Sequence, residues 1–240
     1  MENSENKSII ITGSSNLSKT EKLLSITQKI LSEIKPQYKS VIIGNQEWMT
    51  RNFDVDRFQN GVLIPHVESN EEWKKAGENG QPAWCYYKNN PENGKKYGKL
   101  YNWYAVNDPC GLAPESWHVP TDEEWTSLVR FLGEEVAGFK LKAVKGWKNW
   151  RYWEDGPREI KNGNGDNSSG FNALPGGYRY YDDRFHKIRE DALFWSATEN
   201  DVDYAWNRIL GSHGANVEKA GSVCLDFNKS YGASVRCLRD

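Results

Sequence analysis

The stretch GSVCLDFNKSYGASVRC, residues 221–237, decides how the fold of this chain is interpreted. It predicts two short strands joined by a turn at residues 228–230. Its second half is regular, with small residues followed by Val235, Arg236 and Cys237. Its first half, residues 222–226, follows no alternation of apolar and polar side chains. The two halves are therefore expected to differ in role.

The composition narrows the class of protein. Of the 240 residues, 38% are hydrophobic and 13% are aromatic, with 11 tryptophans. Tryptophan buries a large area and keeps a polar N–H group, so this content is typical of a fold poor in long helices or of an adhesive binding face. The net charge of −2 disfavours nucleic acid and anionic membranes as partners. A mean hydropathy of −0.80 predicts no membrane insertion.

The start of the chain and its cysteines bear on the compartment. Residues 1–19 lack the basic start and apolar core of a signal peptide. We therefore expect a protein that is made in the cytoplasm, and association with a virion is compatible with this expectation. The four cysteines, at positions 85, 110, 224 and 237, form no CxxC pair, which disfavours a zinc site. A chain of this length does not require a disulfide framework.

Residues 1–38 are expected to form an N-terminal extension with one amphipathic helix. Ser18 and Glu21 match the S-x-x-E capping box, and apolar residues then repeat at helical spacing until Pro36. This helix either packs on the main domain or mediates oligomerisation. It holds too few heptads to form a coiled coil alone.

Residues 39–240 are expected to form one α+β domain with few helices and many loops. The sequence VIIGNQEWM, residues 41–49, predicts a hairpin with a Gly-Asn turn. Residues 54–100 are predicted to be rich in loops, and residues 145–170 to form one long, Trp-rich loop. Short strands that alternate with Gly turns are expected towards the end of the chain.

A second helix is predicted over residues 122–136. Thr121 and Glu124 form its capping box. The apolar side chains that follow recur at helical spacing and are expected to be buried on one face: Trp125, Leu128, Val129 and Leu132.

The residue chemistry disfavours an enzyme. The chain has no Gly-rich phosphate loop, HExxH motif or G-x-S-x-G motif, and none of its four histidines has a ligand partner at helical spacing. His118 is expected to be structural, with one ring nitrogen bonded to the backbone. Four oxygen-bearing side chains of the long loop could hold Ca²⁺: Asp155, Glu159, Asp166 and Asn167. Their spacing matches no EF-hand, so a solvated loop without a cofactor is favoured.

Six motifs occur in order along the second domain and together resemble one family. They are IGNQEWM (43–49), YGKLYNWYA (97–105), WHVPTDEEW (117–125), GFNALPGGYR (170–179), FWSATE (194–199) and YGASVRC (231–237). Over about residues 40–240 the chain resembles the Fibrobacter succinogenes major paralogous domain, whose members look like C-type lectin fold proteins.

This resemblance implies a C-type lectin-like fold with two main helices, small antiparallel sheets and long loops, in addition to the N-terminal helix. It also implies that residues 228–237 form a buried closing strand. The run Trp206-Asn207-Arg208 departs from the Trp-Asn-Asp run of sugar-binding relatives, so calcium-dependent sugar binding is not expected. Formylglycine-generating enzymes share the fold, but Cys224 and Cys237 lack the context of their catalytic cysteines.

A subset of the family resembles the variable proteins of diversity-generating retroelements, in which a C-terminal segment is rewritten. Here the variable region is expected at about residues 199–226. Its candidate ligand-binding residues are Asp201, Asp203, Tyr204, Asn207, Ile209, Ser212, His213, Asn216, Glu218, Ser222, Cys224 and Asp226. Four of them are expected to lie exposed on one face: Asp203, Tyr204, Asn207 and Asn216. The alternative is that these are ordinary strand and loop residues.

The resulting hypothesis is a phage or mobile-element receptor-binding protein with a diversified C-terminal binding face. Its partner would be a cell-surface protein or glycan, and analogy with phage receptor-binding proteins suggests a homo-oligomer, namely a trimer. The first alternative is a module that binds glycan or protein through a fixed site. The second is an enzyme of the formylglycine-generating type.

Overall fold

The computed structural model describes residues 18, 20–24, 26, 27, 38–152, 159–180, 184–220 and 227–240. The chain divides into two units, Met1–Gln37 and Tyr38–Asp240. In the first unit, the Ser18 amide donates to Glu21 Oε2 (2.7 Å) and the Glu21 amide donates to Ser18 Oγ (3.2 Å). The predicted capping box is therefore confirmed, and most of the remaining predicted helix lies outside the described residues.

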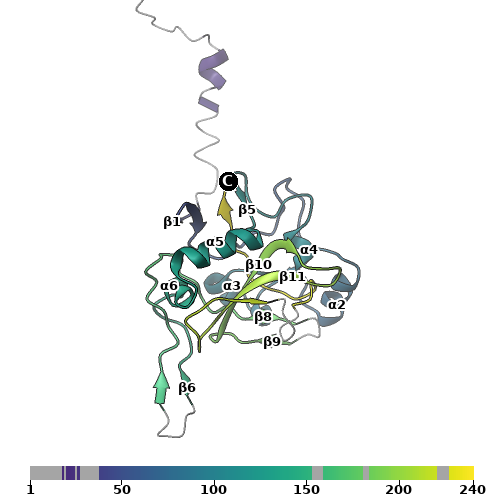
Figure 1. Cartoon of the computed structure of the whole chain (residues 1–240). Helices are drawn as coiled ribbons and strands as arrows, with labels where there is room; N and C mark the ends of the chain where they lie inside the picture. Colours follow the sequence, from purple (N-terminus) through teal and green to yellow (C-terminus); the bar gives the residue numbers. More distant parts are fainter. Residues whose placement is uncertain are drawn as a thin grey trace, which may run out of the picture. The chain divides into compact units, whose positions relative to one another are not determined.

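The second unit is an α+β domain with several small antiparallel sheets, as predicted (Figure 1). A four-stranded sheet has the order β1 (Ser40–Ile43), β2 (Gln46–Met49), β13 (Leu238–Arg239) and β5 (Trp117–His118). A three-stranded sheet has the order β10 (Asp191–Glu199), β11 (Ala205–Gly211) and β12 (Glu218–Ala220). The two-stranded pairs are β3 (Trp84–Cys85) with β4 (Leu100–Tyr101), β6 (Trp150–Tyr152) with β7 (Glu159–Lys161), and β8 (Tyr178–Arg179) with β9 (Phe185–His186).

The helices of this unit are short. They are α2 (Asn70–Glu78), α3 (Pro91–Tyr97), α4 (Trp103–Val106), α5 (Asp122–Leu132) and α6 (Ala137–Leu141), with a 3₁₀ turn at Tyr87–Asn89. No helix in the described part of the chain is long and apolar enough to cross a membrane.

Two local predictions are confirmed. The β1–β2 hairpin turns through Gly44 and Asn45, with Ile43 opposite Gln46 and a positive φ of 64° at Gly44. Thr121 and Glu124 form the capping box of α5, which buries the three apolar side chains at positions 125, 128 and 132. The helix ends at residue 132 rather than 136, because Gly133 adopts a positive φ of 90°. Val129 was predicted to be buried as well, but it is only half-buried.

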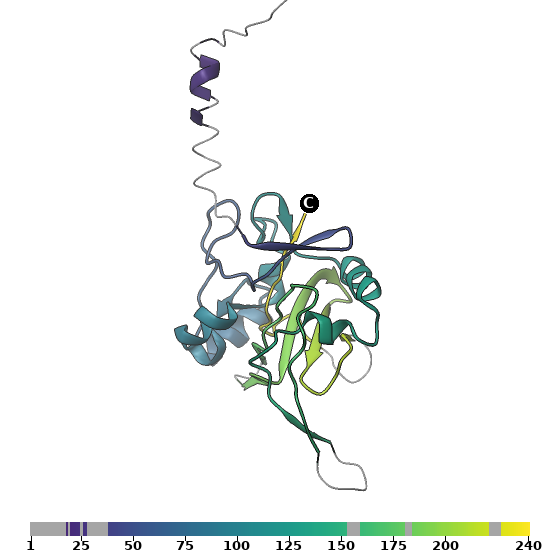
Figure 2. The ribbon, with the colours of Figure 1, turned by 90° about the vertical axis from the view of Figure 1, so that its left-hand side faces the viewer.

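Two other segments differ from their predictions. Residues 54–100 are rich in loops, as predicted, but they also contain α2 and α3, which were not predicted. A signal for α2 was present in Ser69 and Glu72, which again match S-x-x-E; the Ser69 hydroxyl accepts from the Glu72 amide (3.2 Å). Residues 145–170 are not one loop, since β6 and β7 pair into an arm that extends away from the rest of the unit in both views (Figures 1 and 2).

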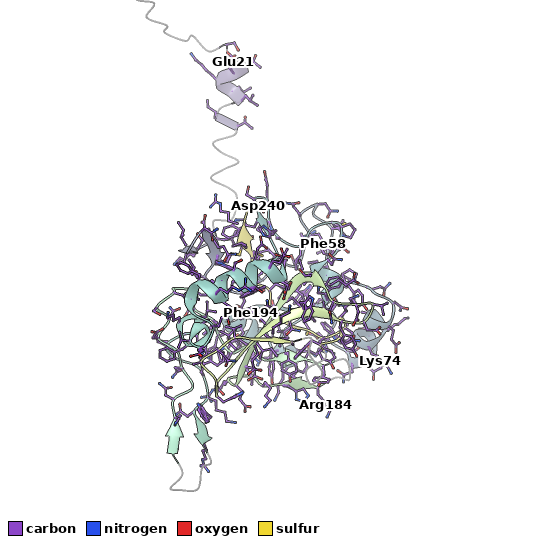
Figure 3. The ribbon with its side chains drawn as sticks, in the orientation of Figure 1. Glu21, Phe58, Lys74, Arg184, Phe194 and Asp240 are labelled. Atoms are coloured by element: carbon purple, nitrogen blue, oxygen red, sulfur yellow. The ribbon has the colours of Figure 1, made fainter. Side chains whose placement is uncertain are left out.

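Aromatic side chains fill the core. Of the tryptophans that the structure describes, seven are buried, namely Trp48, Trp73, Trp84, Trp103, Trp125, Trp147 and Trp195. Under α5, the rings of Trp48 and Trp125 lie 4.7 Å apart, and Phe194 (labelled in Figure 3) packs 5.6 Å from Trp125. Most tryptophans thus serve the core rather than a binding face.

Five of these indoles also donate to backbone carbonyls of other segments. Trp73 donates to the Ser230 carbonyl (2.9 Å), Trp84 to that of Ile64 (3.0 Å) and Trp103 to that of Ser196 (3.0 Å). Trp147 donates to the Ala173 carbonyl (3.1 Å), and Trp195 donates to the Tyr101 carbonyl (2.8 Å). A buried carbonyl that lacks a donor costs about 1–3 kcal/mol. These tryptophans therefore supply hydrogen bonds where regular secondary structure is missing.

The closing segment, residues 227–238, is buried as predicted, apart from a half-buried residue 228, but it is not one strand of a ladder. Its backbone forms single bridges to several elements, with Gly232 opposite Arg179, Ala233 opposite Tyr101, and Ser234 opposite Phe194. Its carbonyls at residues 235 and 237 accept from the amides of residues 53 and 49 (2.8 and 3.0 Å). The segment thus joins parts of the domain that lie far apart in sequence.

Two buried arginines bind carbonyls in the same way. Arg236 Nη1 donates to the carbonyls of Met49 (2.9 Å) and Phe171 (2.6 Å), and Nη2 donates to Asn52 Oδ1 (2.7 Å). Arg179 donates to the carbonyls of residues 67, 68 and 69 and to the side chain of residue 70, all at 2.9–3.1 Å, just before and at the start of α2. Their exposed fractions are 1% and 0%. Both arginines are therefore internal cross-links between loops.

We predict that Arg236→Met lowers the free energy of unfolding by roughly 3–5 kcal/mol, because it strips donors from three buried acceptors. Arg239→Met is the matched control, since Arg239 is exposed and pairs with Glu47 (3.2 Å) at the surface; its cost should stay below about 1 kcal/mol. Urea unfolding of both variants measures the difference. Equal losses would contradict the role assigned to Arg236.

His118 joins the end of the domain to α5. Its Nδ1 lies 2.7 Å from Asp240 Oδ1 and its Nε2 lies 3.0 Å from Glu124 Oε1. The predicted bond of a ring nitrogen to the backbone is not found, because both ring nitrogens contact carboxylates. Both ring nitrogens can donate only when the imidazole is protonated. Partial burial lowers its pKa, but the two carboxylate contacts outweigh this effect and raise the pKa above its usual value.

Because the folded state raises this pKa, the stabilisation is complete below about pH 6.5, the usual histidine pKa, and is lost as the pH rises through the higher folded value. We therefore expect His118→Gln to flatten the dependence of unfolding free energy on pH above about pH 6.5. Urea unfolding at a series of pH values checks this. If wild type and variant follow parallel curves throughout, His118 does not supply the pH dependence.

Candidate functional site

The structure separates the predicted binding residues instead of gathering them. Asp201, Asp203 and Tyr204 lie in the turn between β10 and β11, whereas residues 212–218 lie beyond the other end of β11. At about 3.3 Å per residue, β11 places Tyr204 and Ser212 roughly 26 Å apart. Ser222, Cys224 and Asp226 lie outside the described residues.

The first group forms a structural turn around a buried lysine. Asp201 Oδ1 accepts from the amides of Asp203 and Tyr204, both at 2.9 Å. Lys229 Nζ, which is buried, bonds to the carboxylate of Glu199 and to the carbonyls of Asp201 (2.6 Å) and residue 202 (2.7 Å). Asp201 and Asp203 are exposed and Tyr204 is half-buried.

Asn207 was predicted to be exposed, but it is buried, as are two other candidate binding residues, Ile209 and Ser212. Their exposed fractions are 0%, 6% and 7%. Asn207 and Ile209 lie two residues apart on β11 and so point to the same face of the sheet, where Ile209 packs in a core cluster with Leu193 and Trp195. Among the described residues, the Asn207 carboxamide oxygen has no hydrogen-bond partner. The expected single face of Asp203, Tyr204, Asn207 and Asn216 therefore does not form.

The second group contributes to a groove at the base of the β6–β7 arm. Ser212 and His213 line it together with Lys148, Trp150, Arg151 and Glu190, and the groove encloses about 640 Å³. His213 and Asn216 are exposed, and Glu218 is half-buried. A volume of a few hundred Å³ is typical of ligand sites in proteins.

Backbone contacts fix the walls of this groove. The Ser212 amide donates to the Glu190 carbonyl (2.7 Å), and the Lys148 amide donates to the Arg189 carbonyl (2.6 Å). A side chain at Gly163 would place its Cβ 2.1 Å from the Lys148 carbonyl oxygen, so only glycine lets the arm approach so closely. Three separate segments are therefore held together at this point.

A buried lysine supports the turn that carries His213. Lys142 Nζ donates to the carbonyls of Gly211 (3.1 Å) and Gly214 (2.8 Å). Burial lowers the pKa of Lys142 to about 8. The imidazole of His213 lies over Gly211, where an added Cβ would come within 2.8 Å of the ring. Lys142 therefore holds the backbone of the turn that carries His213, and the missing side chain of Gly211 leaves room for the His213 ring.

The charges of the groove are partly neutralised internally. Glu190 binds Lys148 Nζ (2.6 Å) and Lys187 Nζ (3.2 Å), and these hydrogen bonds, that of Lys148 first, hold its pKa below the usual range. Burial raises the pKa of Asp191 to about 6, against the opposing charges of Lys187 and His213. Within the described part of the chain, the exposed Arg151 forms no ion pair. The groove therefore includes an exposed cationic side chain.

Sequence reasoning found only part of this site. It named Ser212 and His213 and noted the Trp-rich segment around Trp150, but it treated the two as separate. Lys142 and Gly163 were missed, because their roles depend on contacts between distant segments. The KGWKNW run with its closely spaced tryptophans was the one available signal for a site at the arm.

Metal binding and thiol chemistry find little support. Asp166 Oδ1 accepts from the amide and hydroxyl of Ser168 (both 2.9 Å), and Asn167 Oδ1 accepts from the Asn172 amide (2.7 Å), so both suggested calcium ligands hold local turns. Asp155 and the side chain of Glu159 lie outside the described residues. Among the side chains that are described, no three His, Cys, Asp or Glu are grouped to hold a metal ion.

The cysteines that the structure describes are free thiols: Cys85, Cys110 and Cys237. Burial raises the pKa of Cys85 to about 11 and raises that of Cys237 as well. A buried thiol with a raised pKa is a poor nucleophile, because the thiolate is the reactive form.

The chain matches the model of the Fibrobacter succinogenes major domain (Fib_succ_major) over residues 41–239. No significant match was found among curated proteins or among solved structures. The matched region covers most of the chain and includes both the buried arginines and the groove. The chain therefore belongs to the Fibrobacter succinogenes major domain family.

Proposed function

We propose that this protein is a ligand-binding module with a C-type lectin-like scaffold and a fixed site in the groove beside the β6–β7 arm. The groove carries the proposal because it combines a suitable volume of about 640 Å³ with side chains from three segments. Its walls are held by backbone bonds and by the buried Lys142. A site held in place before binding loses less entropy when a ligand binds.

A catalytic role has less support. The buried thiols of Cys85 and Cys237 have raised pKa values, which is the opposite of an activated nucleophile. His213 has Asp191 nearby, but no nucleophilic side chain is bonded to either of them within the described part of the chain. We therefore infer that the protein binds its ligand without catalysing a reaction.

A diversified receptor-binding face is a second candidate, favoured by the exposure of Asp201, Asp203, His213 and Asn216. The burial of Asn207 and Ile209 argues against it, since free substitution of core residues typically costs stability. A template repeat and a reverse transcriptase in the flanking DNA would support this candidate, and their absence would remove it.

Two paired variants test the site on arrays of glycans and surface proteins. Trp150→Ala with His213→Ala removes two groove side chains, whereas Asp203→Ala with Tyr204→Ala alters the turn at the far end of β11. We predict that the groove pair weakens binding roughly tenfold or more, because it removes an aromatic and a polar contact. The turn pair should bind like wild type.

The reverse result would contradict the proposal. Binding that survives the groove pair but is lost in the turn pair would place the site at residues 201–204, in the other part of the set predicted from the sequence. Circular dichroism of both pairs verifies that each remains folded.

A further inference from the structure

The lining of the groove identifies the class of ligand that it suits. The lining combines polar and charged side chains with the apolar surfaces of Trp150 and Ile160, so it suits a ligand that has both polar and apolar faces. Asn149, Ser212 and His213 offer both donors and acceptors of the kind that bind hydroxyl groups. Trp150, which is half-buried and has Lys161 Nζ 5.9 Å from its ring centre, adds an aromatic surface. The C–H groups of a pyranose ring pack well on an indole, so this combination suits a saccharide.

The charge of the groove adds a requirement. The Glu190 carboxylate is shared by Lys148 (2.6 Å) and Lys187 (3.2 Å), so it is already neutralised by the protein. Arg151 is exposed in the lining and has no carboxylate partner in the described part of the chain. Its planar guanidinium can bind a carboxylate through two parallel hydrogen bonds. The groove therefore has a place for one negative charge of the ligand.

The rim reinforces this preference. Arg189 lies beside the groove, since its carbonyl accepts from the Lys148 amide, and its side chain is exposed. The ammonium of Lys142 lies beneath the turn that carries His213 and is bonded to carbonyls rather than to a carboxylate. Asp191 lies near Lys187 and His213 and offsets part of this positive charge, whereas the side chains of Arg151 and Arg189 are exposed to an anionic ligand.

We propose that the groove binds a carboxylate-bearing saccharide, of the hexuronic acid class, with the sugar ring on Trp150 and the carboxylate on Arg151. This inference rests on the proposed ligand-binding function and specifies its ligand. An acidic peptide could meet Arg151 as well, but the hydroxyl-matching side chains and the single indole favour a sugar.

A panel of oligouronates tests the inference by isothermal titration calorimetry. Oligomers of galacturonate, glucuronate, mannuronate and guluronate are each compared with their methyl esters, which keep the sugar and remove the charge. We expect at least one acid to bind. The affinity of its methyl ester should be lower by about tenfold or more. Added salt should weaken binding of the acid, since the contact with Arg151 is exposed.

Arg151→Gln is the variant that removes the proposed carboxylate contact, and it should weaken binding of the acid by about tenfold. Arg130→Gln is the matched control, because Arg130 is an exposed arginine on α5 that pairs with Glu134 outside the groove; it should leave binding unchanged. The inference is overturned if no acid binds, if acid and ester bind equally, or if Arg151→Gln binds like wild type.

Failure of this inference can be told apart from failure of the proposed function. A neutral glycan or a protein whose binding is lost in the Trp150 and His213 pair would refute the uronate ligand and leave the groove as the binding site. Binding that does not depend on the groove at all would refute both.

Discussion

Buried loop carbonyls that must find donors are the constraint on which this structure depends. The strands are short, and several contain only two residues, so regular ladders satisfy only part of the buried backbone. Side chains provide the remaining donors. Arg179 and Arg236 each bind several acceptors in separate segments, Lys142 and Lys229 bind pairs of carbonyls, and five tryptophan indoles bind one carbonyl each. Tryptophan and arginine suit this task because both combine a large packing surface with fixed N–H donors.

This constraint also explains the closing stretch of the chain. Residues 227–238 thread between elements, and their backbone forms bridges to the segments at Arg179, Tyr101 and Phe194. Small residues are needed there; at Gly232 an added Cβ would lie 3.0 Å from the Trp73 ring. The regular half of the stretch is therefore framework, whereas residues 222–226 lie outside the described part of the structure.

Local signals in the sequence predicted local structure well. The capping boxes at Ser18 and Thr121 and the turn at Gly44 depend on residues three or fewer positions apart, and all three are present. The predictions failed where distant contacts decide. Asn207 was predicted to be a variable surface residue, yet it is fully buried on the face of the sheet that carries the core residue Ile209. The groove could not be foreseen either, because the arm, the turn before β10 and the turn after β11 meet only in the folded chain. A buried side-chain donor is used there as well, since Lys142 binds the carbonyls of the turn that carries His213. Lys142 thus links the framework to the proposed site.

Hydrogen exchange in an Arg179→Met variant tests the role of the buried donors most directly. Arg179 is the side chain that binds the carbonyls leading into α2, and its guanidinium packs 4.4 Å from the centre of the Trp73 ring. If these bonds hold α2 in place, the amides of α2 should exchange much faster in the variant through local opening, while the amides of β10 and β11 keep most of their protection. Unchanged protection of α2 relative to β10 and β11 would contradict the interpretation that buried side-chain donors hold this domain together.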